Sequence, residues 1–210
     1  MKLSAWAWIG LTACATTVAC SSNDATTSKN ATENPSSASS SAVVTSTVSA
    51  RPTLTDPKLQ PPSQKDNKYA AGLPVVVFDP CTWISDQTIE KAGFDPASRQ
   101  RIQDMVAEQT FLTCEFTSKT KDLRINSANV PWDQDLQKNA AWGPPITVSG
   151  RQAIWNRDTT LHGTCEIDLR TKAGFVQIAT DLNQNATQAS PCDGLLDIAT
   201  AIEPEIGKDN

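Results

Sequence analysis

The chain has 210 residues, of which 39% are hydrophobic, and a formal net charge of −5 at pH 7. This length suffices for one ordinary domain, but the apolar residues are spread unevenly, so different parts of the chain are expected to differ in structure. The acidic balance argues against a nucleic-acid-binding protein and against direct contact with anionic lipid headgroups.

Residues 1–19 have the pattern of an export signal. Lys2 supplies the positive start, and an apolar segment of roughly the 7 to 15 residues that such signals use follows it. The segment is too short for a transmembrane helix, which needs about 20 apolar residues. We therefore predict an exported protein from which this signal peptide is removed.

Cys20 follows a stretch of small, uncharged residues, 17–19, at the end of the apolar segment. This junction resembles the lipobox of bacterial lipoproteins, and the resemblance implies that the Cys20 thiol takes a diacylglycerol and its freed amine an acyl chain. Two or three acyl chains hold a protein firmly at a membrane, so lipid would replace a membrane span. Cys14 follows a better lipobox leucine but leaves a very short signal, so the prediction places the lipid on Cys20. The alternatives are a plain secretory signal with an unmodified cysteine and a buried cysteine in an N-terminal helix.

Residues 20–72 are predicted to form a disordered tether. The stretch 21–68 contains 18 serines and threonines and no aromatic residue. Such a segment cannot bury enough apolar surface to offset the entropy lost on ordering. Its composition also resembles that of O-glycosylated stalks, and glycosylation of the tether is a hypothesis motivated by that composition.

A globular domain is predicted from 73 to 207, and three helices are expected in it. Ser85 is a good N-cap for a helix that ends at Gly93. A short helix is predicted after Asp95, with Ile102, Met105 and Val106 on one face. The third helix is predicted to start at Ser190 and Pro191 and to carry an apolar stripe of Leu195, Ile198, Ala199 and Ile202.

The remaining apolar segments alternate with the period of a strand. Leu112, Cys114 and Phe116 share one face, as do Cys165, Ile167 and Leu169. Residues 122–128, 145–157 and 174–180 are also predicted as strands. The predicted fold class is therefore α+β, with a mostly antiparallel sheet of five or six strands, about three helices packed on it, and two disulfides.

Four cysteines belong to the domain: Cys81, Cys114, Cys165 and Cys192. An even number in an exported chain favours two disulfides, and the absence of a CxxC pair together with a single histidine predicts no metal site and no cofactor. Four cysteines allow three connectivities. Cys81 and Cys192 each follow a proline and precede a helix, whereas the other two point into the core from strands. Pairing sequence neighbours, Cys81 with Cys114 and Cys165 with Cys192, attaches one helix to the sheet at each end of the domain.

The order of these motifs resembles a known family. FDPCTWIS is followed about 30 residues later by TCEF, then by a C-x-I-x-L strand and by SPC before an apolar helix. This order resembles the actinobacterial lipoprotein family called domain of unknown function 3558, over about residues 74–207. The resemblance implies a lipid-anchored envelope protein with an α+β domain, distantly similar to the extracytoplasmic sensor domains of some actinobacterial kinases. It implies no activity and no catalytic residues.

Few residues suggest chemistry. His162, the only histidine, is interpreted as a turn residue beside a disulfide rather than half of a catalytic dyad. Asp133 and Asp135 stand two positions apart and could form a carboxylate pair, although similar pairs are common on solvated loops. Trp132 and Trp142 lie in a long predicted connection, where aromatic rings can line a ligand groove or cover the sheet.

The sequence therefore predicts a lipoprotein without enzymatic activity, on the extracytoplasmic face of the cell membrane. Its expected partners are the membrane, through the lipid on Cys20, and a ligand that binds near Trp132 and Trp142: an envelope lipid, a glycan, a peptide or a membrane protein. Nucleic acid is not expected. One alternative is an envelope hydrolase that uses Asp133 or Asp135, with or without His162. Another is a purely structural or assembly role.

Overall fold

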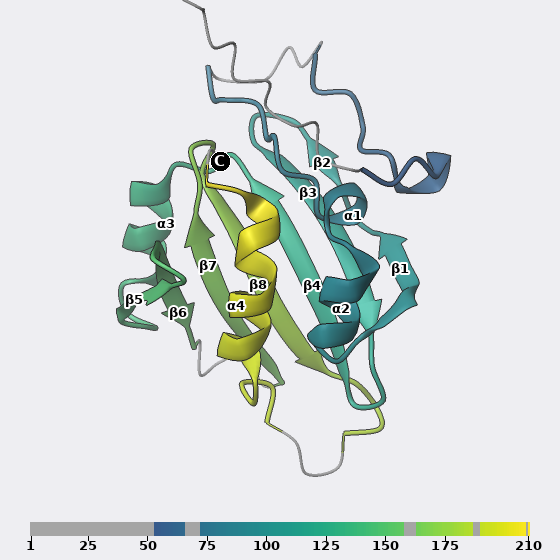
Figure 1. Cartoon of the computed structure of the whole chain (residues 1–210). Coiled ribbons are helices and arrows are strands. Elements are labelled where there is room, and N and C mark those ends of the chain that lie inside the picture. The colour runs from purple at the N-terminus through teal and green to yellow at the C-terminus, as the bar shows by residue number, and fades with distance from the viewer. Residues whose placement is uncertain (1–52, 66–71, 158–162, 187–189, 209) are drawn as a thin grey trace, which may run out of the picture. The chain divides into compact units, whose positions relative to one another are not determined.

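A computed structural model describes residues 53–65, 72–157, 163–186, 190–208 and 210. In these residues one sheet of eight strands runs in the order β1-β3-β4-β8-β7-β6-β5, and β2 pairs with the edge of β3 (Figure 1). Every pairing is antiparallel. The strands are β1 (Asp95–Arg101), β2 (Met105–Val106), β3 (Thr110–Thr117), β4 (Lys121–Ala128), β5 (Pro145–Val148), β6 (Arg151–Asn156), β7 (Thr164–Arg170) and β8 (Phe175–Leu182). The α+β class is confirmed, with more strands than the predicted five or six.

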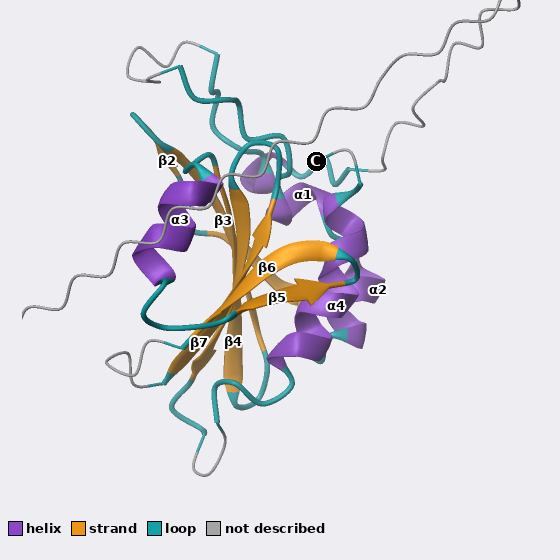
Figure 2. Cartoon of the chain, turned by 90° about the vertical axis from the view of Figure 1, so that its left-hand side faces the viewer, coloured by secondary structure: helices purple, strands orange, loops and turns teal. Residues whose placement is uncertain are grey.

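The helices cover both faces of the sheet. Figure 2 shows α1, α2 and α4 on one face and α3 on the other. Their bounds are α1 (Pro80–Trp83), α2 (Asp86–Lys91), α3 (Trp132–Asn139) and α4 (Leu195–Ile206), and a short 3-10 helix, η1 (Pro57–Leu59), precedes them. Within the described ranges, none of these helices has the length and apolar character needed to cross a membrane.

The main core lies between the sheet and the helices α2 and α4. The predicted alternation is confirmed, because Leu112, Cys114 and Phe116 are all buried, as are the matching residues of β7. The predicted stripe of α4 faces the same core. Ser85 caps α2 as expected, its hydroxyl accepting a hydrogen bond from the Thr88 N–H.

The predicted cysteine pairing is confirmed. Cys81 bonds Cys114 and Cys165 bonds Cys192. The first disulfide attaches α1 to β3, and the second attaches the turn before α4 to β7. The first disulfide therefore joins a helix to the sheet, and the second joins to the sheet the turn that leads into α4.

The predicted helix after Asp95 is wrong, since residues 95–101 form the edge strand β1. Residues 95–101 carry no apolar helical stripe, whereas β3 offers a free edge, and Arg101 pairs with Cys114 there. The register shifts between Asp95 and Gln100, and this irregularity at a sheet edge accommodates Pro96. Met105, expected to face the core, lies in β2 and is 46% exposed.

Helix α4 begins later than predicted, at Leu195. Ser190 and Pro191 lie in a turn that holds Cys192 beside β7, and Gly194 then takes a left-handed conformation with φ of 74° as the helix N-cap. The disulfide fixes the position of the turn, and the helix starts only after the chain has reversed at Gly194.

Residues 53–65, which we call the docked segment, lie against the domain although they were predicted to belong to the disordered tether. Leu54 N–H donates to the Thr82 carbonyl over 2.8 Å, and Arg101 Nε donates to the Leu59 carbonyl over 3.0 Å. Side chains and backbone groups of the domain thus bind this segment directly, so contacts begin before the predicted boundary at 73. The predicted signal, Cys20 and the remainder of the tether up to residue 52 lie outside the described residues.

Candidate functional site

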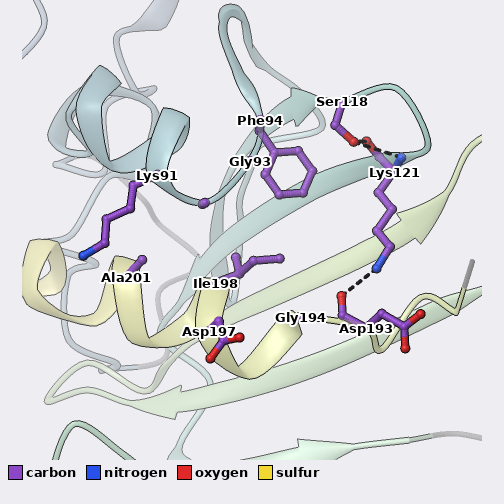
Figure 3. Close-up of a pocket in the computed structure, with 11 residues that line it drawn as sticks. Lys91, Gly93, Phe94, Ser118, Lys121, Asp193, Gly194, Asp197, Ile198 and Ala201 are labelled. Atoms are coloured by element: carbon purple, nitrogen blue, oxygen red, sulfur yellow. Dashed lines mark hydrogen bonds between the residues drawn. The ribbon is translucent and has the colours of Figure 1, made fainter.

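A cleft of about 350 Å³ opens between α2, α4 and the turn that joins β3 to β4 (Figure 3). Away from the cleft, the end of α4 is bonded to the start of α2: Glu205 Oε1 accepts hydrogen bonds from the Ser85 and Thr88 hydroxyls. Among the described residues, no side-chain hydrogen bond joins the end of α2 to the start of α4. The cleft therefore lies between the end of α2 and the start of α4, whereas the start of α2 is bonded to the end of α4.

The floor of the cleft is apolar and its ends are basic. Phe94 and Ile198 are almost fully buried and form the floor, together with Ala201. Figure 3 shows Lys91 and Lys121 on opposite sides of this floor. Such an arrangement suits a small molecule with an apolar body and a negatively charged or acceptor group.

Local structure holds Lys121 at the cleft. The Ser118 hydroxyl donates to the Lys121 carbonyl and accepts from its N–H, which closes the β3–β4 turn. The Lys121 ammonium donates to the Asp193 carbonyl over 2.6 Å. Partial burial lowers the pKa of Lys121, and the nearby Asp193 charge opposes that shift.

The start of α4 adds polarity to the same cleft. Gly194 lines the cleft and has no side chain that could cap the helix. The first N–H groups of a helix carry partial positive charge and attract anions. Asp193 and Asp197 also line the cleft, so the two carboxylates equal the two lysines in formal charge.

A second cleft of about 670 Å³ adjoins the first and shares Gly93, Phe94 and Ser118 with it. Its other lining residues are polar and include Lys119 and Thr120 of the β3–β4 turn. A ligand longer than the first cleft could therefore continue along this turn.

The two tryptophans proposed from sequence lie elsewhere. The predicted connection around them contains α3, and Trp132 at its start is only 8% exposed, packed with Val130, Ile154 and Phe175. Trp142 follows α3 and is half-buried. Neither ring lines the cleft in Figure 3, and a ligand role for the pair stays a prediction.

The predicted carboxylate pair is not brought together. Asp133 is exposed on α3, whereas Asp135 is 4% exposed and points towards the sheet. His162, the third residue of the hydrolase hypothesis, lies outside the described residues.

Asp135 instead belongs to a buried acid cluster between α3 and the sheet, formed by Asp135, Asp168 and Glu166 with two asparagines. Asn139 Nδ2 donates to Asp135 Oδ1 over 3.0 Å and to Asp168 Oδ2 over 3.3 Å. Asn156 Nδ2 donates to Asn139 Oδ1 and to Glu166 Oε2, each over 3.2 Å. In the described part of the chain, Asp135 Oδ2 and Asp168 Oδ1 have no hydrogen-bond partner.

Burial favours the protonated form of these acids. It raises the pKa of Asp135 to about 6, against the effects of Lys138 and the Asn139 hydrogen bond. Burial, followed by the charges of Asp135 and Glu166, raises the pKa of Asp168 well above its usual range. Burial also raises the pKa of Glu166, which Arg124 opposes. Burial therefore shifts the titration of all three acids to higher pH.

Sequence reasoning missed both sites. Asp168 alternates with the core-facing Ile167 and Leu169 and so belongs to the opposite face of the sheet. That face is covered by α3, which sequence reasoning had treated as a connection. The described residues contain no group of three or more His, Cys, Asp or Glu side chains that could hold a metal ion.

Comparison with known proteins gives one match. The model of a family described as "Protein of unknown function (DUF3558)" matches residues 10–205. Comparisons with curated proteins and with solved structures give no match.

Proposed function

The chain belongs to the DUF3558 family of proteins of unknown function, and we propose that it is a lipid-anchored binding protein of the cell envelope. The apolar start of the chain followed by Cys20 supports export and lipidation. The two disulfides support an oxidising compartment outside the cytoplasm. The tether would then connect the lipid to the domain.

The observation that carries the binding role is the cleft between α2 and α4. Its apolar floor and the uncapped start of α4 suit an amphipathic ligand with an anionic group, and its two lysines add positive charge that Asp193 and Asp197 offset. We propose that the domain binds such a ligand without converting it, because no nucleophile with an adjacent base lines the described cleft.

Lipidation can be tested by labelling with radioactive palmitate in a bacterium that makes lipoproteins. We expect the wild-type chain and a Cys14→Ser variant to take up label and a Cys20→Ser variant to take up none, since only the Cys20 thiol would accept the diacylglycerol. If the Cys20→Ser variant takes up label and the Cys14→Ser variant does not, the lipid is attached to Cys14. A wild-type chain without label would refute the lipid anchor itself.

Binding in the cleft can be tested with 1-anilinonaphthalene-8-sulfonate, whose apolar rings and sulfonate match the lining of the cleft. We expect its fluorescence to rise on binding and its affinity to fall at least tenfold, about 1.4 kcal/mol, in an Ala201→Glu variant. The added carboxylate would fill the cleft and repel the sulfonate. Thr200→Glu is the matched control, because Thr200 is the exposed neighbour of Ala201 on α4.

A second pair of variants tests the role of charge. Lys121→Gln should lower the affinity for the dye. Lys172→Gln, at the exposed β7–β8 turn, should leave that affinity unchanged. Equal dye binding by the wild type and both cleft variants would show that the cleft is not the site of binding.

A further inference from the structure

Residues 74–78, which we call the edge segment, lead into α1 (Figure 1) and have features of a strand without belonging to the sheet. Val76 and Phe78 are 4% and 1% exposed, whereas Val75 and Val77 are 59% and 57% exposed. This alternation has the period of two of an extended chain. Two large aliphatic side chains therefore point outward from one short stretch of backbone.

Side-chain amides occupy one edge of this extended stretch. The Gln64 amide donates to the Val76 carbonyl over 2.9 Å, and its Oε1 accepts from the Val76 N–H over 3.0 Å. The Gln64 amide thus makes the same pair of hydrogen bonds to Val76 that the backbone of a residue in an antiparallel partner strand would make. Asn129 Nδ2 also donates to the Pro74 carbonyl over 3.0 Å.

The opposite edge is open. In an extended chain the N–H and C=O groups of Val75 and Val77 point away from those of Val76. Across the described residues these four backbone groups have no hydrogen-bond partner. Buried backbone groups are almost always paired, and both valines are more than half exposed, so the free groups face solvent.

We propose that the edge segment binds an extended peptide of a partner protein by strand addition. Two residues of the peptide would pair with Val75 and Val77, and its aliphatic side chains would pack on the two exposed valines. Residues 70–207 carry 11 Lys and Arg against 18 Asp and Glu, a net charge of −7, which favours a neutral or basic peptide over an acidic one. Proline cannot supply the N–H that this pairing needs.

A second copy of the chain fits this surface less well. A stable dimer buries about 800 Å² on each partner, which is far more than two valine side chains offer. A short peptide needs no such area and binds more weakly than a stable dimer does. The expected interaction is therefore transient.

The test is a selection from a random heptapeptide library on phage, with the purified full-length protein as the target. We expect it to enrich peptides without proline in which aliphatic residues alternate. Fluorescence polarisation should then show that a Val77→Pro variant binds the enriched peptides at least tenfold more weakly, a loss of about 1.4 kcal/mol. Val77→Thr keeps the N–H and a β-branched side chain, so it is the matched control.

Folding of the Val77→Pro variant is expected to be normal, because the Val77 N–H is unbonded and proline favours an extended conformation at Val76. An independent measurement leaves the protein unchanged and N-methylates alternate amides of the peptide. One of the two alternating sets should abolish binding, because it removes the donors that face the edge segment. Equal binding by both N-methylated peptides, equal affinity of the Pro and Thr variants, or no enriched peptide would overturn the proposal. So would dimers in light scattering that are lost with Val77→Pro, since a second copy would then be the partner.

Discussion

Replacing Cys81 and Cys114 together by alanine is expected to lower the free energy of unfolding by about 3 to 4 kcal/mol. The disulfide joins residues 33 positions apart, so losing it frees a long loop in the unfolded chain. Both sulfurs are also fully buried in the main core, where truncation leaves unfilled space. For a small domain this loss is a large part of the whole stability.

Urea unfolding of the oxidised wild type and the double variant measures this difference. The exposure of the cysteines adds a kinetic expectation: a reductant should open the bond of the half-buried Cys192 first, and should reach Cys81 only as the domain unfolds. An unfolding midpoint that does not change on removal of Cys81 and Cys114 would show that the bond contributes nothing to the fold.

The sequence predicted those parts of the fold in which local pattern and burial agree. Leu112, Cys114 and Phe116 alternate because one face of β3 covers the core, so their period reports the strand directly. The predicted pairing joined each inward-pointing strand cysteine to its sequence neighbour before a helix, and the structure has the same two bonds.

The errors arose where distant groups decide the local structure. Residues 95–101 become a strand because β3 has an edge to pair, which no property of the segment itself reveals. The docked segment is ordered by the Arg101 guanidinium, which also binds Asp79 over 2.6 Å. Neither the cleft nor the acid cluster has a sequence motif, because each is assembled from elements far apart in the chain.

Replacing Asp168 by asparagine is expected to make the domain more stable at neutral and alkaline pH. Asp168 is fully buried, and its Oδ1 has no hydrogen-bond partner in the part of the chain that the structure describes. Its ionised form would lie beside two other carboxylates without a paired cation of its own. Asparagine keeps the shape and the acceptor for Asn139 and removes the charge, so the cost of holding a proton or a charge there disappears.

The sign of the pH dependence follows from the raised pKa values. An aspartate has a pKa of about 3.9 in the unfolded chain. Burial raises the pKa of Asp135 to about 6, and it raises the pKa of Asp168 well above its usual range. The folded state therefore binds more protons than the unfolded state above about pH 4. The stability that the protonated acids contribute is complete below that pH and is lost as the pH rises through their folded pKa values. Each acid can lower the free energy of unfolding by up to about 1.4 kcal/mol for each pH unit in its window.

Urea unfolding can be measured at a series of pH values between about 4 and 8. The free energy of unfolding should fall more steeply with rising pH for the wild type than for Asp168→Asn, because the variant keeps only the acids at Asp135 and Glu166. Asp133→Asn is the matched control, since Asp133 is exposed on the same helix as Asp135 and should change stability by no more than about 0.5 kcal/mol at any pH. Parallel curves for the wild type and Asp168→Asn would mean that Asp168 ionises alike in the folded and unfolded states. Its burial under α3 would then carry no electrostatic cost.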